Sequence, residues 1–513
     1  AAWMIFWNLY QRITEGKRMV DTKKEQERDE LHRAIWAIAD ELRGAVDGWD
    51  FKNYVLGTMF YRYISENLCN YINSGEIDAG NTDFDFAKMS DEDAEEAREG
   101  LVEEKGFFIP PSELFCNVRV NAANDENLNE TLERVFRHIE ESAKGSEAES
   151  DFAGLFDDYD VNSNKLGATV AKRNEKLVKL LNGVGEMNLG DVKDHSIDAF
   201  GDAYEYLMTM YASNAGKSGG EFFTPADVSE LLTRLGTVGK TEINKVYDPA
   251  CGSGSLLLKA EKILGKDAIR NGFYGQEINI TTYNLCRINM FLHDVGFDKF
   301  NIACEDTLLN PQHWDDEPFE LIVSNPPYSI KWVGKDNPLL INDPRFAPAG
   351  VLAPKSKADM AFIMHSLSWL ASNGTAAIVC FPGIMYRGGA EQKIRKYLVE
   401  NNYVDCIIQL PGNLFFGTSI ATCIMVMKKN KTDNDVLFID ATKECIKVTN
   451  NNKLTEENIN EFGRLDELKK TVDKEKAKAF FEEREKTKLI PPKVNMKTDR
   501  MLRTFIITGG IEI

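Results

Sequence analysis

The sequence predicts an α/β protein built on a doubly wound, mainly parallel sheet, with an α-helical domain before the sheet and a helical tail after it. Three observations predict this class. Apolar residues recur at helical spacing through the first part of the chain, short apolar runs alternate with amphipathic segments after about residue 196, and a charged, helix-forming stretch lies near the end. Strands that alternate with helices are typical of a parallel sheet with helices on both faces.

The first part of the chain carries helical periodicity from about Asp29 to Ile72, and again, beyond an acidic stretch, to about residue 190. Apolar residues stand at i, i+3, i+4 and i+7 in two series, which are Ile35, Ile38, Ala39 and Leu42, and then Leu56, Met59, Phe60 and Tyr63. We therefore expect four parts, which are an extraneous or disordered start (1–18) ahead of a natural start near Met19, an α-helical N-terminal domain (19–190), an α/β domain (191–440) and a polar helical tail (441–513).

Six short apolar runs in the second part predict strands, at 245–247, 273–274, 301–303, 321–323, 376–379 and 406–408. The segment 420–429 follows the last run too closely for a helical crossover, so we expect an antiparallel edge strand there. Beyond Lys431 the chain is mostly polar apart from 436–440, and residues 465–488 have the composition of one charged helix.

The charge of the chain limits what it can bind by itself. The formal net charge is −20, from 61 basic and 81 acidic residues. Because affinity for nucleic acid rests largely on lysine and arginine neutralising phosphates, we expect weak DNA binding unless the chain has a local basic groove or a partner. No apolar run approaches the roughly 20 residues of a membrane span, so we expect no membrane association.

The cysteines and histidines do not predict a metal site. Nine cysteines form no C-x-x-C pair, and the six histidines show no metal-ligand spacing. This pattern is typical of reduced thiols in a cytoplasmic protein. The apolar stretch near the start has no basic segment before it, so we do not expect a signal peptide.

A glycine-rich turn follows the first predicted strand. Asp248 ends that strand, Gly252 and Gly254 lie in the turn, and a helical pattern begins at Ser255. Glycines at a strand-to-helix turn let the backbone approach a ligand, and the helix N-terminus offers unpaired N–H groups. A nicotinamide enzyme would carry G-x-G-x-x-G, but the third position here is Leu257, which disfavours that class. A turn without a ligand is the alternative.

Acidic residues end the next two predicted strands. Glu277 follows the glycine turn at a distance typical of a carboxylate that binds the ribose hydroxyls of a nucleoside. Asp306 ends the third strand, where it could meet an adenine amino group, with Glu305 as its rival. The alternative for each is a solvated strand-end acid. A phosphate-binding loop at 216–218 is disfavoured, because Tyr211 stands where its first glycine would be.

The fourth strand end carries Asn325, Pro326, Pro327 and Tyr328, which together can hold a flat amine. Asn325 Oδ1 and the Pro326 carbonyl can accept both protons of one exocyclic amino group, while Tyr328 stacks on its ring. Two acceptors favour the pyramidal nitrogen of a methyl-transfer transition state. A rigid turn is the alternative, since two prolines fix the backbone. A cytosine-C5 enzyme would need a Pro-Cys dipeptide, which the sequence lacks.

Taken in order, the motifs at 248–254, 277, 306 and 325–328 resemble the S-adenosylmethionine and catalytic motifs of amino-group DNA methyltransferases. Segment 218–232 resembles their additional cofactor motif, and its place ahead of the glycine turn marks the γ arrangement. Further segments narrow the resemblance to the modification (M) subunit of type I restriction–modification systems, over roughly residues 29 to 440; these segments are 30–68, 201–208, 353–367, 381–398 and 410–421.

The resemblance implies a Rossmann-like S-adenosylmethionine-dependent methyltransferase domain over 191–440 and assigns roles to single residues. Asn325, Pro326, Pro327 and Tyr328 match the catalytic motif that holds and stacks the target adenine. The residues matching cofactor contacts are Glu221, Phe222, Phe223, Thr224, Pro225, Ala226, Asp248, Gly252, Ser253, Gly254, Ser255, Glu277 and Asp306. The implied reaction moves a methyl group from S-adenosylmethionine to N6 of an adenine flipped out of double-stranded DNA.

The resemblance also implies partners and leaves two alternatives. In this family a separate specificity (S) subunit reads the DNA, two M subunits join one S subunit, and a restriction (R) subunit completes the complex. Lysines 331, 335, 355 and 357 could be local phosphate contacts or an ordinary solvated surface. The alternatives are a methyltransferase for another planar nitrogen, in a protein glutamine or an RNA guanine, and an inactive methyltransferase-like scaffold. The match fades after about Asp440, where family members dock the S subunit.

Overall fold

A computed structural model describes residues 23, 25–40, 48–189, 199–214, 224–415, 418–448, 451–465 and 503–508. The chain divides into two compact units. Unit 1 contains Ala1–Ala215 and Arg287–Asp298, and unit 2 contains Gly216–Cys286 and Lys299–Ile513. The predicted start (1–18) and nearly all of the predicted charged helix (465–488) lie outside the described residues, and the four-part division of the chain stays a prediction.

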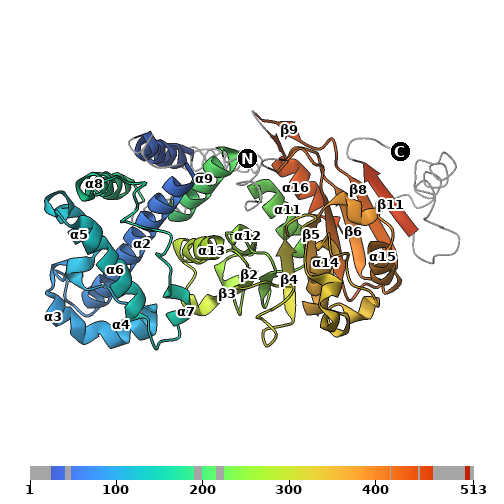
Figure 1. The fold of residues 1–513 in the computed structure, drawn as a ribbon, viewed down its shortest axis with the longest axis horizontal. Coiled ribbons are helices and arrows are strands. Elements are labelled where there is room, and N and C mark those ends of the chain that lie inside the picture. The colour runs from blue at the N-terminus through green and yellow to red at the C-terminus, as the bar shows by residue number, and fades with distance from the viewer. Residues whose placement is uncertain are drawn as a thin grey trace, which may run out of the picture. The chain divides into compact units, whose positions relative to one another are not determined.

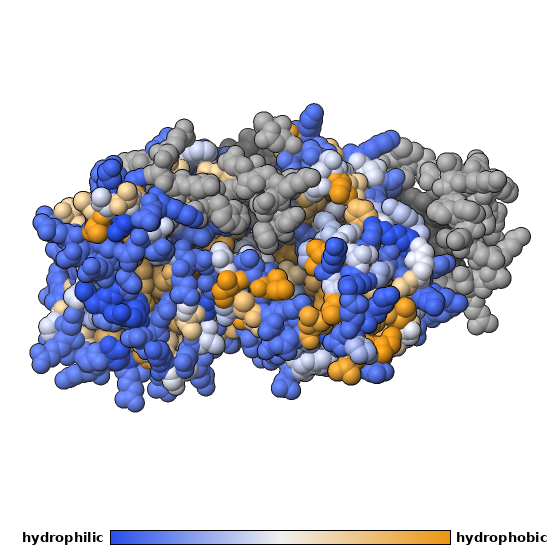
Figure 2. Space-filling model, viewed as in Figure 1, coloured by the Kyte–Doolittle hydropathy of each residue, from blue (hydrophilic) through white to orange (hydrophobic). Residues whose placement is uncertain are grey.

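Unit 1 is helical, as the periodicity predicts (Figure 1). Residues 25–40 form a helix, followed by α2 (Gly48–Asp78), α3 (Asp91–Ala94), α4 (Arg98–Lys105), α5 (Phe115–Asn121), α6 (Leu128–Ser142), α7 (Glu149–Phe152), α8 (Val170–Glu186) and α9 (Ala199–Asn214). Its core is rich in aromatic rings; Phe136 and Phe156 stack with their centroids 4.3 Å apart, and Phe60 lies 5.5 Å from Phe156. The surface over α3 and α4 is largely hydrophilic (Figure 2), in keeping with their acidic sequences.

Unit 2 is built on one nine-stranded sheet, in the order β11-β8-β6-β7-β5-β4-β1-β2-β3 (Figure 1). Its strands are β1 (Val246–Asp248), β2 (Phe273–Glu277), β3 (Phe300–Cys304), β4 (Phe319–Ser324), β5 (Leu370–Cys380), β6 (Val404–Gln409), β7 (Cys423–Lys428), β8 (Asp435–Asp440) and β11 (Arg503–Thr508). All neighbouring strands pair in parallel except β7, which is antiparallel to both β5 and β6. The predicted α/β class is confirmed.

The position of β7 corrects one prediction. The segment is antiparallel as expected, but it is not an edge strand, because it lies between β5 and β6. Residues 423–427 are all buried. A continuous apolar run is typical of a strand covered on both faces, and it was the signal for an interior position. Beyond β7 the sheet continues through β6 and β8 to β11, and β11 is a strand that the expected helical tail did not include.

Helices cover both faces of this sheet, which makes it doubly wound. The helices of unit 2 are α11 (Ala226–Gly236), α12 (Ser255–Leu264), α14 (Asp359–Trp369), α15 (Ala390–Glu400) and α16 (Glu456–Phe462), while α13 (Ile280–Leu292) begins in unit 2 and ends among unit 1 residues. Ile322 of β4 packs with α14 side chains. Its neighbour Leu321 points to the other face, where a Cβ on Gly236 of α11 would lie 2.2 Å from Leu321 Cδ1. A larger residue at position 236 would therefore force the buried Leu321 side chain to shift.

The described residues also bear on membrane and metal binding. Among them, no helix is both long and apolar enough to cross a membrane. They also contain no group of three or more histidine, cysteine or acidic side chains placed to hold a metal ion. A two-stranded pair, β9 (Ile446–Lys447) with β10 (Asn452–Lys453), lies outside the main sheet.

Candidate cofactor and substrate pocket

The carboxyl ends of β1, β2, β3 and β4 surround one cavity of about 290 Å³ in unit 2. The sheet order reverses between β1 and β4, and such a reversal is where ligands bind in doubly wound sheets. Nine of the residues predicted from sequence line the cavity, namely Thr224, Asp248, Gly252, Ser253, Ser255, Glu277, Asp306, Asn325 and Pro327. Motifs spread over a hundred residues of sequence therefore meet at one edge of the sheet.

The glycine turn brings backbone to the cavity wall. Gly252 and Gly254 have φ values of +54° and +80°, a region that favours glycine. The N–H of Gly252 donates to Glu277 Oε2 over 3.1 Å, and Gly254 precedes the first residue of α12, Ser255. The turn thus places the N-terminus of a helix, with its unpaired N–H groups, beside the cavity.

Asp248 is a fully buried acid at the end of β1. Its Oδ1 accepts hydrogen bonds from Ser324 Oγ (2.7 Å) and from the N–H of Ala250 (3.0 Å). Its Oδ2 is buried and has no hydrogen-bond partner among the described residues. Burial, and secondarily the charge of Glu277, raise the pKa of Asp248 to about 7. Burial makes the ionised form of Asp248 unfavourable, and a ligand that pairs with the carboxylate relieves this cost. Asp248 lines the cavity, so it favours a ligand that is cationic or that donates a hydrogen bond.

Glu277 ends β2 with both carboxylate oxygens held by backbone. Oε2 accepts from Gly252, and Oε1 accepts from the N–H of Asn279 over 2.9 Å. Burial raises the pKa of Glu277, and these backbone hydrogen bonds oppose the rise. Each oxygen keeps a further lone pair for a ligand hydroxyl.

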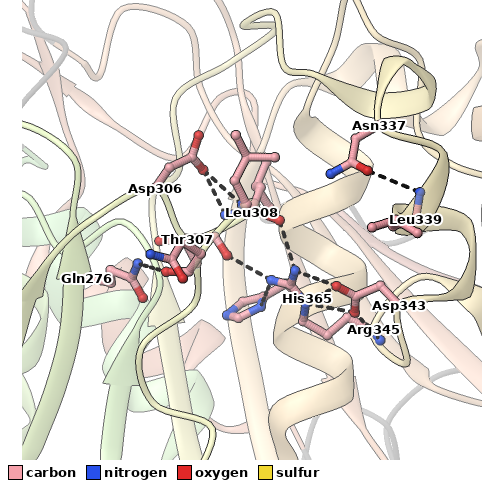
Figure 3. Close-up of polar contacts among 11 residues, drawn as sticks. Gln276, Asp306, Thr307, Leu308, Asn337, Leu339, Asp343, Arg345 and His365 are labelled. Carbon is pink, nitrogen blue, oxygen red and sulfur yellow. Dashed lines mark hydrogen bonds and ion pairs between the residues drawn. The ribbon is translucent and has the colours of Figure 1, made fainter.

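Asp306 lies two residues beyond the end of β3, in a tight turn (Figure 3). Its Oδ1 accepts from the N–H groups of Leu308 (2.9 Å) and Leu309 (3.3 Å), and Asp306 lines the cavity. The rival acid, Glu305, is exposed, does not line the cavity, and accepts from the Asp306 N–H instead. The geometry therefore favours Asp306 over Glu305 as the residue that faces a ligand.

Asn325 lies at the end of β4 with its amide held from two sides. Its Nδ2 donates to Thr224 Oγ1 over 3.0 Å, and its Oδ1 accepts from the hydroxyl of Tyr328. The ring of Tyr328 meets Phe415 edge-on, with centroids 6.3 Å apart. Burial raises the pKa of Tyr328 well above its usual value, so its hydroxyl is a donor. An amine bound at Asn325 Oδ1 would compete with this hydroxyl.

The structure places the remaining predicted residues apart from the cavity wall. Pro225 precedes α11 and Ala226 begins it, Gly254 precedes α12, Pro326 is buried, and Tyr328 is half-buried and does not line the cavity. The predicted cofactor contacts Glu221, Phe222 and Phe223 lie outside the described residues. Among the four lysines, Lys331 is exposed and lines the cavity, while Lys355 pairs with Asp336.

Sequence reasoning missed several residues of the wall, including Gln276, Trp332 and Phe362. Gln276 is fully buried in β2. Its Nε2 donates to the carbonyls of Glu305 and Asn310, each over 3.0 Å, and so fastens the turn around Asp306. The sequence signal that could have identified Gln276 was an amide next to Glu277 in a strand of otherwise apolar or small residues. A buried amide needs hydrogen-bond partners, so such a residue is expected to hold a neighbouring loop.

Two family descriptions cover most of the chain. Residues 195–500 match the N-6 DNA methylase family, and residues 31–184 match the HsdM N-terminal domain. The first match covers residues 216–286 and 299–500 of unit 2 together with residues 195–215 and 287–298 of unit 1, and the second lies within unit 1.

Individual proteins agree with these matches. The methylase subunit of the type I restriction enzyme MpnII, from Mycoplasma pneumoniae, is 51% identical over 458 residues, which are 86% of this chain and 84% of that protein. The crystal structure of a type I restriction–modification methyltransferase subunit from Streptococcus thermophilus superposes with a TM-score of 0.78 at 35% identity, covering 87% of this chain and 94% of that one. A modification subunit of a type I enzyme from Vibrio vulnificus, at 16% identity and a TM-score of 0.56, shares the fold over 88% and 91% of the two chains.

Proposed function

The chain belongs to the N-6 DNA methylase family and, within it, to the methyltransferase (M) subunits of type I restriction–modification systems, and from this premise we propose how the pocket works. It binds S-adenosylmethionine and transfers the methyl group to N6 of an adenine flipped out of double-stranded DNA. The observation that carries the proposal is the meeting of Asp248, Glu277, Asp306 and Asn325 around one cavity.

The residues at the first three strand ends suit a nucleoside with a cationic side chain. Glu277 keeps acceptor capacity for ribose hydroxyls, and Asp306 offers Oδ2 to an adenine amino group. The unpaired Oδ2 of Asp248 suits the cationic methionine portion, together with the N–H groups and hydroxyls at Ser253 and Ser255. When bound, S-adenosylmethionine supplies an electrophilic methyl group. Asp248 and Glu277 are both acidic, so they favour a cationic cofactor over its neutral product.

Asn325 then acts on the target amine. Its Oδ1 and the carbonyl of Pro326 accept both amino hydrogens of adenine, and the ring of Tyr328 stacks on the base. An aromatic amine is a poor nucleophile because its lone pair is delocalised, and two acceptors stabilise the pyramidal, more nucleophilic nitrogen. Thr224 holds Nδ2 of Asn325, which turns Oδ1 away from Thr224 and toward the incoming amine. The base must leave the duplex first, since N6 lies inside the stack.

Sequence recognition falls to other chains. A net charge of −20 is unfavourable for tight DNA binding by this chain alone. We therefore assign target reading to an S subunit, with two M subunits to one S subunit and an R subunit in the full complex. The motif order assigns the enzyme to the γ class.

The test is transfer of a tritiated methyl group from S-adenosylmethionine to unmethylated DNA, with the chain alone and with a co-expressed S subunit. We expect label in DNA adenine, strongly dependent on the S subunit. Label only in protein or RNA would instead indicate a methyltransferase for another planar nitrogen. If isothermal titration detects no binding of S-adenosylmethionine to the folded protein, the chain is an inactive scaffold.

A further inference from the structure

The turn that presents Asp306 to the cavity is fastened from outside by a buried arginine. This residue, Arg345, comes from residues 329–358, the segment that follows the Asn325–Tyr328 motif and that we call the excursion. The turn and the excursion are distant in sequence, and neither belongs to a regular strand. Their connection therefore depends on side chains (Figure 3).

Arg345 uses its whole guanidinium group, and its side chain is only 1% exposed. Nη1 donates to the carbonyl of Thr307 (2.8 Å) and Nη2 to the carbonyl of Leu308 (2.9 Å). Asp343 accepts from Nε (3.0 Å) and Nη2 (2.7 Å), so the ion pair is bidentate. Nη1 also lies 3.2 Å from His365 Nδ1. The planar fork matches two carbonyls and one carboxylate at once, which a lysine cannot do.

His365 must be neutral for this arrangement. A guanidinium can only donate, so Nδ1 of His365 accepts and its proton lies on Nε2, which donates to the hydroxyl oxygen of Tyr247 over 2.9 Å. Burial and the charge of Arg345 keep the pKa of His365 well below its usual value. Asp343 pairs with Arg345 as its carboxylate, and the network reaches β1 through Tyr247.

The excursion is itself tied to the catalytic motif. Ser329, next to Tyr328, donates its N–H to both oxygens of Asp359 (3.2 and 3.1 Å), the first residue of α14. The N–H of Ala358 donates to the carbonyl of Ile330 over 2.9 Å, which closes the excursion at its base. The excursion thus connects two parts of the site. It begins at the base-holding motif, and its Arg345 side chain contacts the Asp306 turn.

We propose that Arg345 is a positioning residue for the cofactor: it fixes Asp306 against the adenine end of the pocket and links that end to the loop that holds the target base. This inference rests on the proposed function. Arg345 does not line the cavity, so it acts through the Thr307–Leu308 carbonyls. Loss of Arg345 should therefore weaken recognition of the adenine amino group in particular.

The test compares two neutral ligands, S-adenosylhomocysteine and its deaminated analogue S-inosylhomocysteine, by isothermal titration. The analogue presents a carbonyl oxygen where adenine presents an amino group, so a placed Asp306 carboxylate discriminates against it. We expect the wild-type protein to prefer S-adenosylhomocysteine at least tenfold. Arg345→Met should lose most of that preference, as Asp306→Ala does, and the double variant should lose little more.

Matched variants separate positioning from general destabilisation. Arg287 of unit 1 is equally buried and also donates to backbone carbonyls, so Arg287→Met should lower the melting temperature yet keep the wild-type preference. Arg345→Lys, which can reach one carbonyl, should restore part of the preference. If Arg345→Met does not fold, Asp343→Asn and Arg345→Lys serve in its place.

Hydrogen exchange gives a second measure. The N–H groups of Leu308, Leu309 and Asn310 close the turn on Asp306, and we expect them to exchange at least tenfold faster in Arg345→Met but not in Arg287→Met. Folded Arg345 variants with wild-type preference and wild-type exchange would overturn the inference. A wild-type protein that binds neither ligand would instead overturn the proposed function.

Discussion

Each unit of this protein contains a buried arginine and a buried aspartic acid, which are Arg287 and Asp151 in unit 1 and Arg345 and Asp248 in unit 2. The two units differ in whether the surroundings of these residues include a ligand cavity. In unit 1, Nη1 of Arg287 donates to the carbonyls of Ser150, Asp151 and Ala153 at the end of α7, at 2.9, 3.2 and 3.0 Å. These are carbonyls that a helix end leaves unpaired, so the arginine completes a piece of fold. In unit 2, Arg345 donates to carbonyls of a turn whose other side faces a ligand cavity.

The aspartic acids make the same contrast. Burial raises the pKa of Asp151 to about 7, against the opposing charge of Arg287. Burial likewise raises the pKa of Asp248 to about 7, but Asp248 lies in the cavity wall. Burial of a charged group is therefore not by itself a sign of function in this chain. The difference is that Asp248, and the turn that Arg345 holds, line the cavity, whereas the residues of unit 1 do not. Matched substitutions in the two units can test this difference.

The largest effect should come from the amide that faces the target base. Asn325→Ala should reduce methylation at least a thousandfold, because Asn325 is the one described residue lining the cavity that has an amide oxygen at the end of β4, and its loss removes one of the two proposed acceptors. S-adenosylmethionine affinity should stay within about threefold. The matched control is Asn174 of unit 1, a buried amide whose Oδ1 accepts from the N–H of Asn129 and whose Nδ2 donates to the carbonyl of Glu126.

Asn174→Ala should lower the free energy of unfolding by about 1–3 kcal/mol and leave turnover per folded molecule unchanged. Methyl transfer to DNA by the complex with S subunit, normalised to active cofactor sites, measures both variants. Near-normal turnover in Asn325→Ala would contradict the two-acceptor mechanism.

The arginines come next in expected size. Removing either one leaves buried carbonyls unpaired, and Arg345→Met also leaves Asp343 without its cation. We expect about 3–5 kcal/mol of lost stability for Arg345→Met and less for Arg287→Met. Urea unfolding followed by circular dichroism measures both. An equal loss in both variants would mean that the Asp343 pair contributes little.

The sequence predicted the parts of the site that depend on local chemistry. Gly252, Glu277, Asp306 and Asn325 each follow a short apolar run, and parallel strands bring such positions to one edge. Arg345 could not be predicted in this way, because its hydrogen-bond partner Leu308 is 37 residues away. The sequence next to Arg345 does not indicate that its side chain is buried. The apolar run of β7 signalled an interior strand, but its neighbours β5 and β6 could not be predicted from it, because they are set by the pairing of the whole sheet.

The aspartic acids give a prediction for pH. Each has a pKa near 7 in the folded protein and about 3.9 when unfolded. Between these two pKa values the acid is ionised in the unfolded chain but still protonated in the folded protein. The free energy of unfolding therefore falls as the pH rises from about 4 to 7, and this decrease is complete above pH 7. Asn at either position removes this loss. Asp151→Asn and Asp248→Asn should each raise stability at pH 8, by no more than about 4 kcal/mol.

Only Asp248→Asn should affect the cofactor. The new amide keeps an oxygen for Ser324 Oγ and Ala250 N but presents an NH₂ group to the cavity. We expect at least tenfold weaker S-adenosylmethionine binding in this variant and unchanged binding in Asp151→Asn. In the wild type, binding near pH 7 should release a proton, seen as a dependence of the titration enthalpy on buffer. Equal cofactor affinity in both variants would remove Asp248 from the site.

The smallest effect concerns Tyr328, whose hydroxyl occupies Asn325 Oδ1 and whose ring we assign to stacking on the base. Tyr328→Phe removes the competing hydroxyl but keeps the ring, so we expect DNA methylation within about threefold of wild type. Tyr328→Ala removes both and should weaken capture of the flipped base by about 1–3 kcal/mol, the value of aromatic stacking on a base. The KM for DNA carrying the target, with cofactor saturating, distinguishes these outcomes. A large loss in Tyr328→Phe would mean that the hydroxyl holds Asn325 in place, and the hydrogen bond seen here would then be part of the working geometry rather than one that the substrate displaces.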